Sequence, residues 1–155
     1  MWFKQIQLFQ FPSNTRFIAD NLAKQLEPFL FQPCLPSHAS SLGWVPPLEN
    51  DQGEGPLVKT INHYMMICLQ IEEKILPSTV IRQELAKKVK QIEIEENRKI
   101  RSKEKLNFKD EITFTLLPRA FSKFTKLYGY IDTQTQQLII ATTNAKKKPS
   151  TLFLS

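Results

Sequence analysis

The sequence predicts an α+β fold in which antiparallel strands pack with helices and with one long basic helix. Three segments support this prediction. Residues 61–71 form a nearly continuous apolar run of strand length, and residues 78–101 repeat apolar side chains at helical spacing. Residues 127–132 and 137–143 are apolar runs separated by a polar turn, as in a β-hairpin. A chain of 155 residues is long enough to bury a core as one domain, or as one domain with an appendage.

The first sixty residues predict a strand, a helix and a long irregular segment. Residues 2–11 place apolar side chains on both sides of an extended chain, which predicts a strand buried on both faces. Ser13 or Asn14 can cap the helix that follows, and Pro28 ends it. Residues 28–60 hold six of the ten prolines, which is typical of irregular structure. The apolar stripe of the helix is formed by Phe17, Ile18, Leu22 and Leu26.

The long basic helix is predicted to begin at Ser78 or Thr79, which can cap it, and to end near Arg101. At 1.5 Å per residue it would be about 36 Å long. A shorter helix is expected over 108–117, where Pro118 breaks it, and another is expected to begin after residue 143. The apolar stripe of the long helix is Ile81, Leu85, Val89 and Ile92.

These elements divide the chain into three successive segments. Residues 1–77 are a strand–helix–loop–strand segment, residues 78–125 are a helical segment, and residues 126–155 are a hairpin with a truncated helix.

Charge is distributed unevenly along the chain. Residues 1–81 hold five Lys/Arg and seven Asp/Glu, a net charge of −2, whereas residues 82–155 hold sixteen and eight, a net charge of +8. A basic face on an ordered element favours a polyanion, most often nucleic acid, as the partner. Five Glu share the same stretch, so a solvated charged helix is the alternative. The candidate DNA-binding cations are Arg82, Lys87, Lys88, Lys90, Arg98, Lys99, Arg101, Lys103 and Lys105.

The basic stretch shows no helix-turn-helix pattern and no cluster of base-reading side chains. It therefore predicts contacts to the phosphate backbone, which do not depend on base sequence. A second basic run, Lys146–Lys148, adds to the positive field. Reversing Lys87, Lys88 and Lys90 to Glu is expected to weaken binding and to flatten its salt dependence.

A Phe-rich segment offers a candidate interface. Phe121 and Phe124 lie three positions apart beside Arg119 and Lys123. Aromatic rings next to cations can stack on bases, form a protein–protein contact or fill the core. We take Arg119, Phe121 and Phe124 as the candidate interface residues. A protein-interaction module built on this segment is one alternative to DNA binding.

A metal-dependent nuclease is a second alternative. Asp51 precedes Glu72-Glu73-Lys74, and an acid followed by acid-x-Lys at a strand end is typical of nucleases that bind Mg²⁺. The same residues also suit an ion-paired strand end, which needs no catalytic role. No catalytic residue is therefore assigned, and the chain is not expected to be an enzyme.

Two cysteines and two histidines could in principle bind zinc. The spacings are Cys34-x₃-His38 and His63-x₄-Cys68. His63 and Cys68 are an odd number of positions apart on a strand and so point to opposite faces. Cys68 also lies in an apolar run, where a buried inert thiol is the usual outcome. We therefore expect neither a metal nor a cofactor.

The location expected from the sequence is the cytoplasm. Two cysteines provide no disulfide framework, and the N-terminus shows no basic region followed by an apolar one. The most apolar stretch, residues 64–71, is too short to span a bilayer, so no membrane association is expected.

Five motifs occur in order along the chain, and together the sequence resembles the bacterial recombination-associated RdgC family. The resemblance runs from residue 1 to about residue 148. Members of this family continue further, so this chain resembles their N-terminal part, with the C-terminal half absent. The motifs are Met1–Lys4, Gly43–Pro47, Glu72–Ser78, Leu116–Ser122 and Ile131–Thr133.

The resemblance implies a non-enzymatic, nucleoid-associated protein that binds double- and single-stranded DNA with little sequence preference. It implies a homodimeric ring whose positive central hole encircles duplex DNA and which limits access of the RecA recombinase to DNA. It also makes Phe121 a candidate for the contact that closes or stabilises the ring, and it implies that residues 72–74 are a structural strand end. A sheet left unfinished by truncation is expected to expose an edge and an apolar face.

Overall fold

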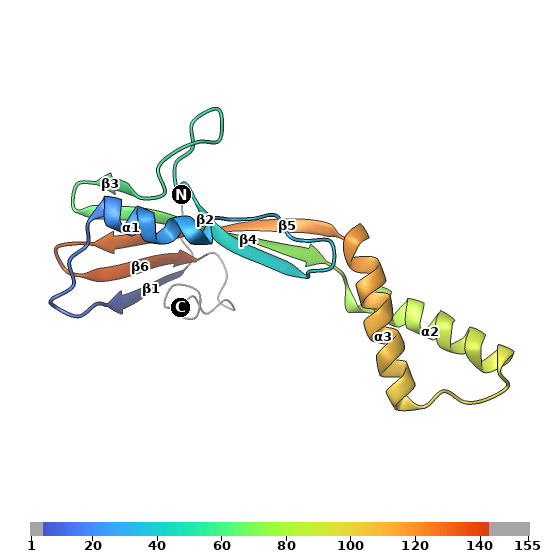
Figure 1. The fold of residues 1–155 in the computed structure, drawn as a ribbon. Helices are drawn as coiled ribbons and strands as arrows, with labels where there is room; N and C mark the ends of the chain where they lie inside the picture. Colours follow the sequence, from blue (N-terminus) through green and yellow to red (C-terminus); the bar gives the residue numbers. More distant parts are fainter. Residues whose placement is uncertain (1–4, 143–155) are drawn as a thin grey trace. The chain divides into compact units, whose positions relative to one another are not determined.

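The structure is a computed structural model and describes residues 5–142. Three motifs or segments of the sequence analysis lie outside these residues: Met1–Lys4, the Lys146–Lys148 run and the helix expected after residue 143. The fold class is α+β, as predicted (Figure 1). In chain order the elements are β1 (Gln5–Gln10), α1 (Ala19–Leu26), η1 (Glu27–Phe29), β2 (Ser40–Val45), β3 (Lys59–Ile61), β4 (Tyr64–Ile75), α2 (Ser78–Glu95), α3 (Ser102–Leu116), η2 (Leu117–Arg119), β5 (Phe121–Asp132) and β6 (Gln137–Thr142).

The strands form one sheet in the order β1-β6-β5-β4-β2, and β3 pairs with β4. The predicted β5–β6 hairpin is confirmed, with Tyr130 opposite Ile139. Two reversals each place a non-glycine residue in the left-handed region of the backbone. Gln136 has φ 56° in the β5–β6 turn, and Asn62 has φ 54° in the β3–β4 turn.

The chain forms two compact units. The sheet unit comprises the described residues of 5–32, 42–71 and 125–142 and contains α1 with most of the sheet. The hairpin unit comprises 33–41 and 72–124 and contains α2 and α3. Within the described part of the chain, no helix is long and apolar enough to cross a membrane.

The core of the sheet unit lies between α1 and one face of the sheet. Leu26 of α1 is buried with Ile67 of β4 and Ile140 of β6. Phe11 and Phe17 extend this core through an edge-to-face contact with ring centroids 4.8 Å apart. A smaller cluster of Leu69, Ile71 and Leu127 packs against Trp44.

The prediction that the first strand is buried on both faces is wrong. Ile6 and Leu8 of β1 are 57% and 62% exposed. β1 is the terminal strand of the sheet, and α1 covers only the face that carries Phe9. In β1, the side that carries Phe9 is therefore covered and the side that carries Ile6 and Leu8 is open.

The long basic helix is about six residues shorter than predicted. α2 ends at Glu95, and Asn97 takes a left-handed φ of 47° just beyond it. Asn is favoured at this position because it tolerates that backbone better than most residues. α3 then begins at Ser102, so the shorter helix starts six residues earlier than expected.

Other boundaries also differ from the prediction. The irregular segment 28–60 contains β2 and most of β3, and the helical segment ends before β5 begins at Phe121. α1 begins at Ala19 and α2 at Ser78, with Ile18 and Pro77 as N-caps and no side-chain capping hydrogen bond at either. Ser13 and Asn14 therefore do not cap α1.

Candidate nucleic-acid interface

The nine candidate cations lie on the two helices of the hairpin unit and on the connection between them. α2 and α3 pack against each other, and the connection spans residues 96–101. Arg82, Lys87, Lys88 and Lys90 are on α2, Arg98, Lys99 and Arg101 are in the connection, and Lys103 and Lys105 are on α3.

The connection between α2 and α3 is fixed by a buried side chain and by a backbone hydrogen bond to α2. Ile100 is 6% exposed, and its backbone N–H donates to Glu93 Oε1 at 3.0 Å. This hydrogen bond lowers the pKa of Glu93, and the nearby Lys99 adds to the effect. The chain therefore turns over a buried side chain and a fixed carboxylate, with its cations on the outside.

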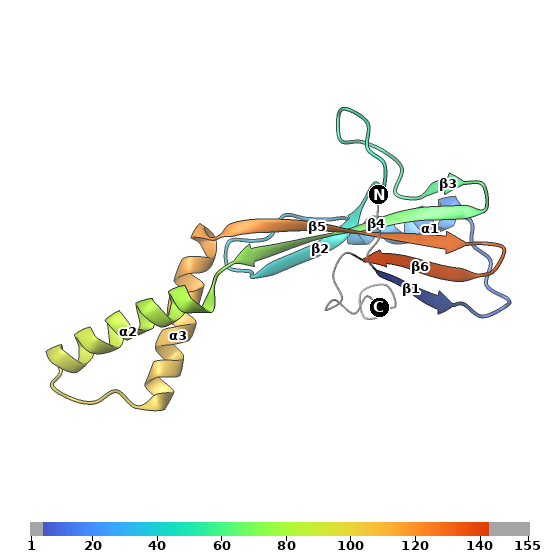
Figure 2. The same ribbon diagram turned by 180° about the vertical axis from the view of Figure 1, so that it is seen from behind.

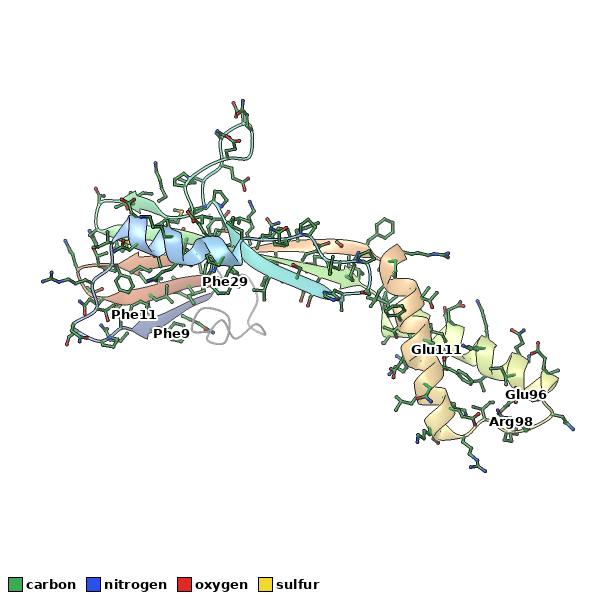
Figure 3. The ribbon with its side chains drawn as sticks, viewed as in Figure 1. Phe9, Phe11, Phe29, Glu96, Arg98 and Glu111 are labelled. Carbon is green, nitrogen blue, oxygen red and sulfur yellow. The ribbon has the colours of Figure 1, made fainter. Side chains whose placement is uncertain are left out.

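Arg98 clamps the connection to α3. Its guanidinium donates to Glu104 Oε1 at 2.8 Å and Oε2 at 3.1 Å, and its Nε donates to Glu96 Oε2 at 2.5 Å. Figure 3 labels Arg98 and Glu96 in the connection after α2. Glu104 also accepts the N–H of Arg101 at 3.1 Å. These hydrogen bonds lower the pKa of Glu104 to about 2 and raise the pKa of Arg98. Two carboxylates thus neutralise Arg98, which suits it to a structural role.

Lys87 and Lys88 are also paired. Lys87 Nζ lies 2.9 Å from Glu84 on the same helix, and Lys88 Nζ lies 2.6 Å from Glu111 of α3. The Lys88 ammonium sits 4.6 Å from the centre of the Phe108 ring, a cation–π contact. Lys88 therefore joins the two helices as well as contributing charge.

Of the nine candidate cations, four have no carboxylate within 4 Å among residues 5–142 and donate no side-chain hydrogen bond there, unlike Arg82, which donates to Ser78. We call them the open cations: Lys90, Arg101, Lys103 and Lys105. All four are exposed. Lys90 and Lys105 line one shallow hollow together with Arg82, while Arg101 and Lys103 line another. The side chain of Lys99 is 94% exposed and lies 3.7 Å from Glu93.

The Arg98–Glu104 pair is expected to make stability depend on acidity. The folded state lowers the pKa of Glu104 from 4.5 to about 2, so the pair stabilises the fold fully above about pH 4.5. That contribution disappears as the pH falls from about 4.5 toward about 2. In Glu104→Gln, thermal melts should show a smaller loss of midpoint across this range than the parent chain shows.

The matched control is Asp110→Asn, which removes a carboxylate from the same helix that has no cation within 4 Å among the described residues. It should keep the acid dependence of the parent chain. Identical pH profiles for Glu104→Gln and the parent would contradict the assignment.

The candidate interface residues lie at the end of the hairpin unit and at the start of β5. Arg119 is exposed, Phe121 is 85% exposed, and Phe124 is 57% exposed. Because Phe121 and Phe124 are three positions apart on a strand, alternation directs them to opposite faces. The two rings therefore do not form one continuous surface on which bases could stack. The interface role of these residues remains a prediction.

Glu72 joins three segments of the hairpin unit. It is 5% exposed, its Oε1 accepts from Ser122 Oγ, and its Oε2 accepts from the Cys34 N–H, both at 2.6 Å. These two hydrogen bonds lower the pKa of Glu72, that from Ser122 most. The Lys74 N–H donates to Ala39 O at 2.8 Å. Both oxygens of the suspected nuclease carboxylate thus bind protein groups, as the structural interpretation of this strand end requires.

The residues considered for metal binding form no metal-binding group of three or more His, Cys, Asp and Glu within residues 5–142. Cys34 Sγ lies 3.0 Å from the carbonyl oxygen of His38. In the sheet unit, His63 faces Asp132 at 3.9 Å, while Cys68 is fully buried and its pKa is raised to about 11 by desolvation. Asp51 lies in the loop before β3.

Sequence reasoning missed the residues that hold the interface together. Glu93, Glu96 and Glu104 were counted only as charges that dilute the basic stretch. One signal could have placed the end of α2 correctly, namely Asn97, because Asn is a common residue just beyond a helix end. No sequence signal indicated that Arg98 would take two of these carboxylates.

Fold and site together define an α+β protein whose helix hairpin presents a cluster of cations. The chain belongs to the RdgC family: the family model described as "Putative exonuclease, RdgC" matches residues 1–154. It is also 38% identical over 154 residues to proteins named recombination-associated protein RdgC from Yersinia enterocolitica, Yersinia pestis and Yersinia pseudotuberculosis. Each match covers 99% of this chain and 50% of the relative, so the chain spans about half the length of these relatives.

Proposed function

We propose that this chain binds the phosphate backbone of DNA, without sequence preference, through the helix hairpin, and so takes part in homologous recombination. The observation that supports it most is the set of open cations, which are exposed and free of carboxylates within 4 Å among the described residues. Cations without local partners are available to replace the counterions of a polyanion. The names of the relatives support the link to recombination.

The proposal separates two kinds of cation on the same hairpin. Arg98 and Lys88 stabilise the turn and the helix pair through Glu104 and Glu111. The open cations contact phosphate. Arg82, which donates from its guanidinium to Ser78 Oγ at 3.3 Å, and Lys99 complete the basic surface.

We also propose for this chain the role in recombination that its resemblance to the RdgC family implies. Bound to DNA, the protein would limit access of the RecA recombinase, act at the nucleoid and form a homodimeric ring around duplex DNA. The proposed partners are double-stranded and single-stranded DNA, with no catalytic step and no cofactor.

Fluorescence anisotropy with a labelled duplex of random sequence tests the proposal. We expect binding that weakens steeply as salt rises and that is the same for unrelated sequences. A folded sample that does not bind at low salt would contradict the proposal. Binding that a scrambled competitor fails to displace would contradict its lack of sequence preference.

The description of the family model favours an exonuclease as a second candidate. In this chain the activity would centre on Glu72 and Lys74. Incubation of end-labelled DNA with the chain and Mg²⁺ tests it, because an exonuclease would progressively shorten the labelled DNA strand. Degradation that persists in Glu72→Gln would remove Glu72 from such a site.

A further inference from the structure

One face of the sheet in the sheet unit carries apolar and aromatic side chains that no described helix covers. α1 packs on the opposite face, over Ile67, Leu138 and Ile140. Figure 2 shows the sheet from behind, with no described helix in front of β1, β6 and β5. We call this surface the open sheet face.

The strand register places the side chains of the open sheet face in two rows. Ile6 pairs with Ala141, which pairs with Tyr128, and Leu8 pairs with Ile139, which pairs with Tyr130. Because directly paired residues point to the same side of a sheet, each row runs across three strands. The two rows contain no charged residue.

The exposed fractions show that the outer end of these rows is open. Ile6 and Leu8 are 57% and 62% exposed, whereas Ala141 is 7% exposed. Desolvation raises the pKa of both Tyr128 and Tyr130, so the phenols stand in weakly polar surroundings. Two adjacent exposed aliphatic side chains on a terminal strand mark an interaction surface more than a solvated one.

The chemistry of the rows selects the class of partner. Phosphate binding needs cations, and the rows have none, whereas uncharged aliphatic and tyrosine side chains are typical of protein interfaces. The ion pair between Lys126 and Glu49, at 3.4 Å, provides a polar border next to Tyr128. The open sheet face therefore fits an apolar protein surface.

The length of the relatives indicates which protein surface this is. They contain about as many residues outside the matched region as inside it, since the 154 matched residues are 50% of each. We infer that the open sheet face docks a polypeptide equivalent to that other half, through Ile6, Leu8, Ile139 and the two tyrosines. This inference does not depend on DNA binding.

Co-expression tests the inference. The probe is the part of the Yersinia enterocolitica relative that lies outside the match, produced in the same cells as the full 155-residue chain. We expect the two polypeptides to co-purify in equal amounts. The double variant Ile6→Lys with Leu8→Lys should weaken the complex at least about 30-fold, the size of effect seen at interface hot spots.

The matched control is Ile94→Lys with Leu106→Lys, because these apolar residues of the hairpin unit are 70% and 57% exposed. It should leave the complex intact. Circular dichroism confirms that both double variants fold, which is expected because all four side chains are exposed.

Three outcomes would overturn the inference. The wild-type chain could fail to co-purify with the probe, or the Ile6/Leu8 variant could bind as tightly as the wild type. In the third, sedimentation of the chain alone would show a dimer that becomes a monomer in the Ile6/Leu8 variant, which would assign the face to a second copy.

Discussion

Arg101→Gln, Lys103→Gln and Lys105→Gln combined in one variant are expected to weaken duplex binding at least about tenfold at moderate salt. All three are open cations on the α3 side of the connection, so their loss removes charge without breaking an ion pair among the described residues. The slope of log affinity against log salt should fall by about 2 to 3, since each phosphate contact contributes about 0.9. Anisotropy titrations over a series of salt concentrations measure both quantities.

The chain offers a control with the same side chains. Arg16→Gln, Lys24→Gln and Lys59→Gln also remove one arginine and two lysines, all exposed and all in the sheet unit. This variant has the same net charge as the test variant. If DNA binding responded only to net charge, the two variants would weaken equally, and the site would not be the helix hairpin.

The effect of the test variant on DNA binding is easier to interpret than the effect of reversing Lys87, Lys88 and Lys90 to Glu. Lys87 and Lys88 pair with Glu84 and Glu111, so reversal would place like charges 3 Å or so apart and disturb the helix pair. A loss of binding in the reversed variant would then have two explanations. Neutral substitution of open cations leaves only one.

Gly43→Ala is expected to cost about 3 kcal/mol of unfolding free energy or more. A Cβ at this position would lie 2.3 Å from Phe31 Cα and 2.4 Å from Phe31 N, and these backbone atoms cannot rotate away. The same segment is fixed by the hydrogen bond from the Phe31 N–H to Trp44 O, at 3.0 Å. Urea unfolding followed by circular dichroism measures the change.

Leu42→Ala is the matched control, because Leu42 precedes Gly43 on β2 and is 50% exposed. It should change the unfolding free energy by less than about 1 kcal/mol. Equal midpoints for the two variants would show that β2 can move away from residues 30 and 31. The expected contrast also gives a physical reason for glycine in the motif Gly43–Pro47.

The fold class and the main strands could be predicted because their signals are local. The apolar run that became β4 and the paired runs of the β5–β6 hairpin depend on alternation and turn residues alone. The sequence also predicted two successive helices, but it did not place the end of the first one at Glu95. The apolar stripe from Ile81 to Ile92 contains no stop signal, and the left-handed Asn97 and the buried Ile100 lie beyond the observed end of that helix.

The candidate site was predicted from the charge of the sequence. Contacts between residues distant in sequence then decide which of its cations are paired. The cations could be named from the sequence, but the sequence does not show that Glu111, 23 positions away, neutralises Lys88. Nor does it show that Glu104 takes Arg98 and leaves Arg101 and Lys103 without a carboxylate. Spacing also misled for Phe121 and Phe124, because a helical segment was assumed where β5 begins.

The helix hairpin is an insertion between two neighbouring strands of the sheet. β4 and β5 are neighbours in the sheet, and α2 and α3 join them, so the hairpin occupies the place in the chain where a short turn would suffice. Within the hairpin unit, α2 and α3 pack on each other and are joined by contacts such as that between Lys88 and Glu111. The open cations make no ion pair among the described residues, so their charge can change without loss of such a contact. The positive charge of this surface and the stability of the helix pair can accordingly be varied separately.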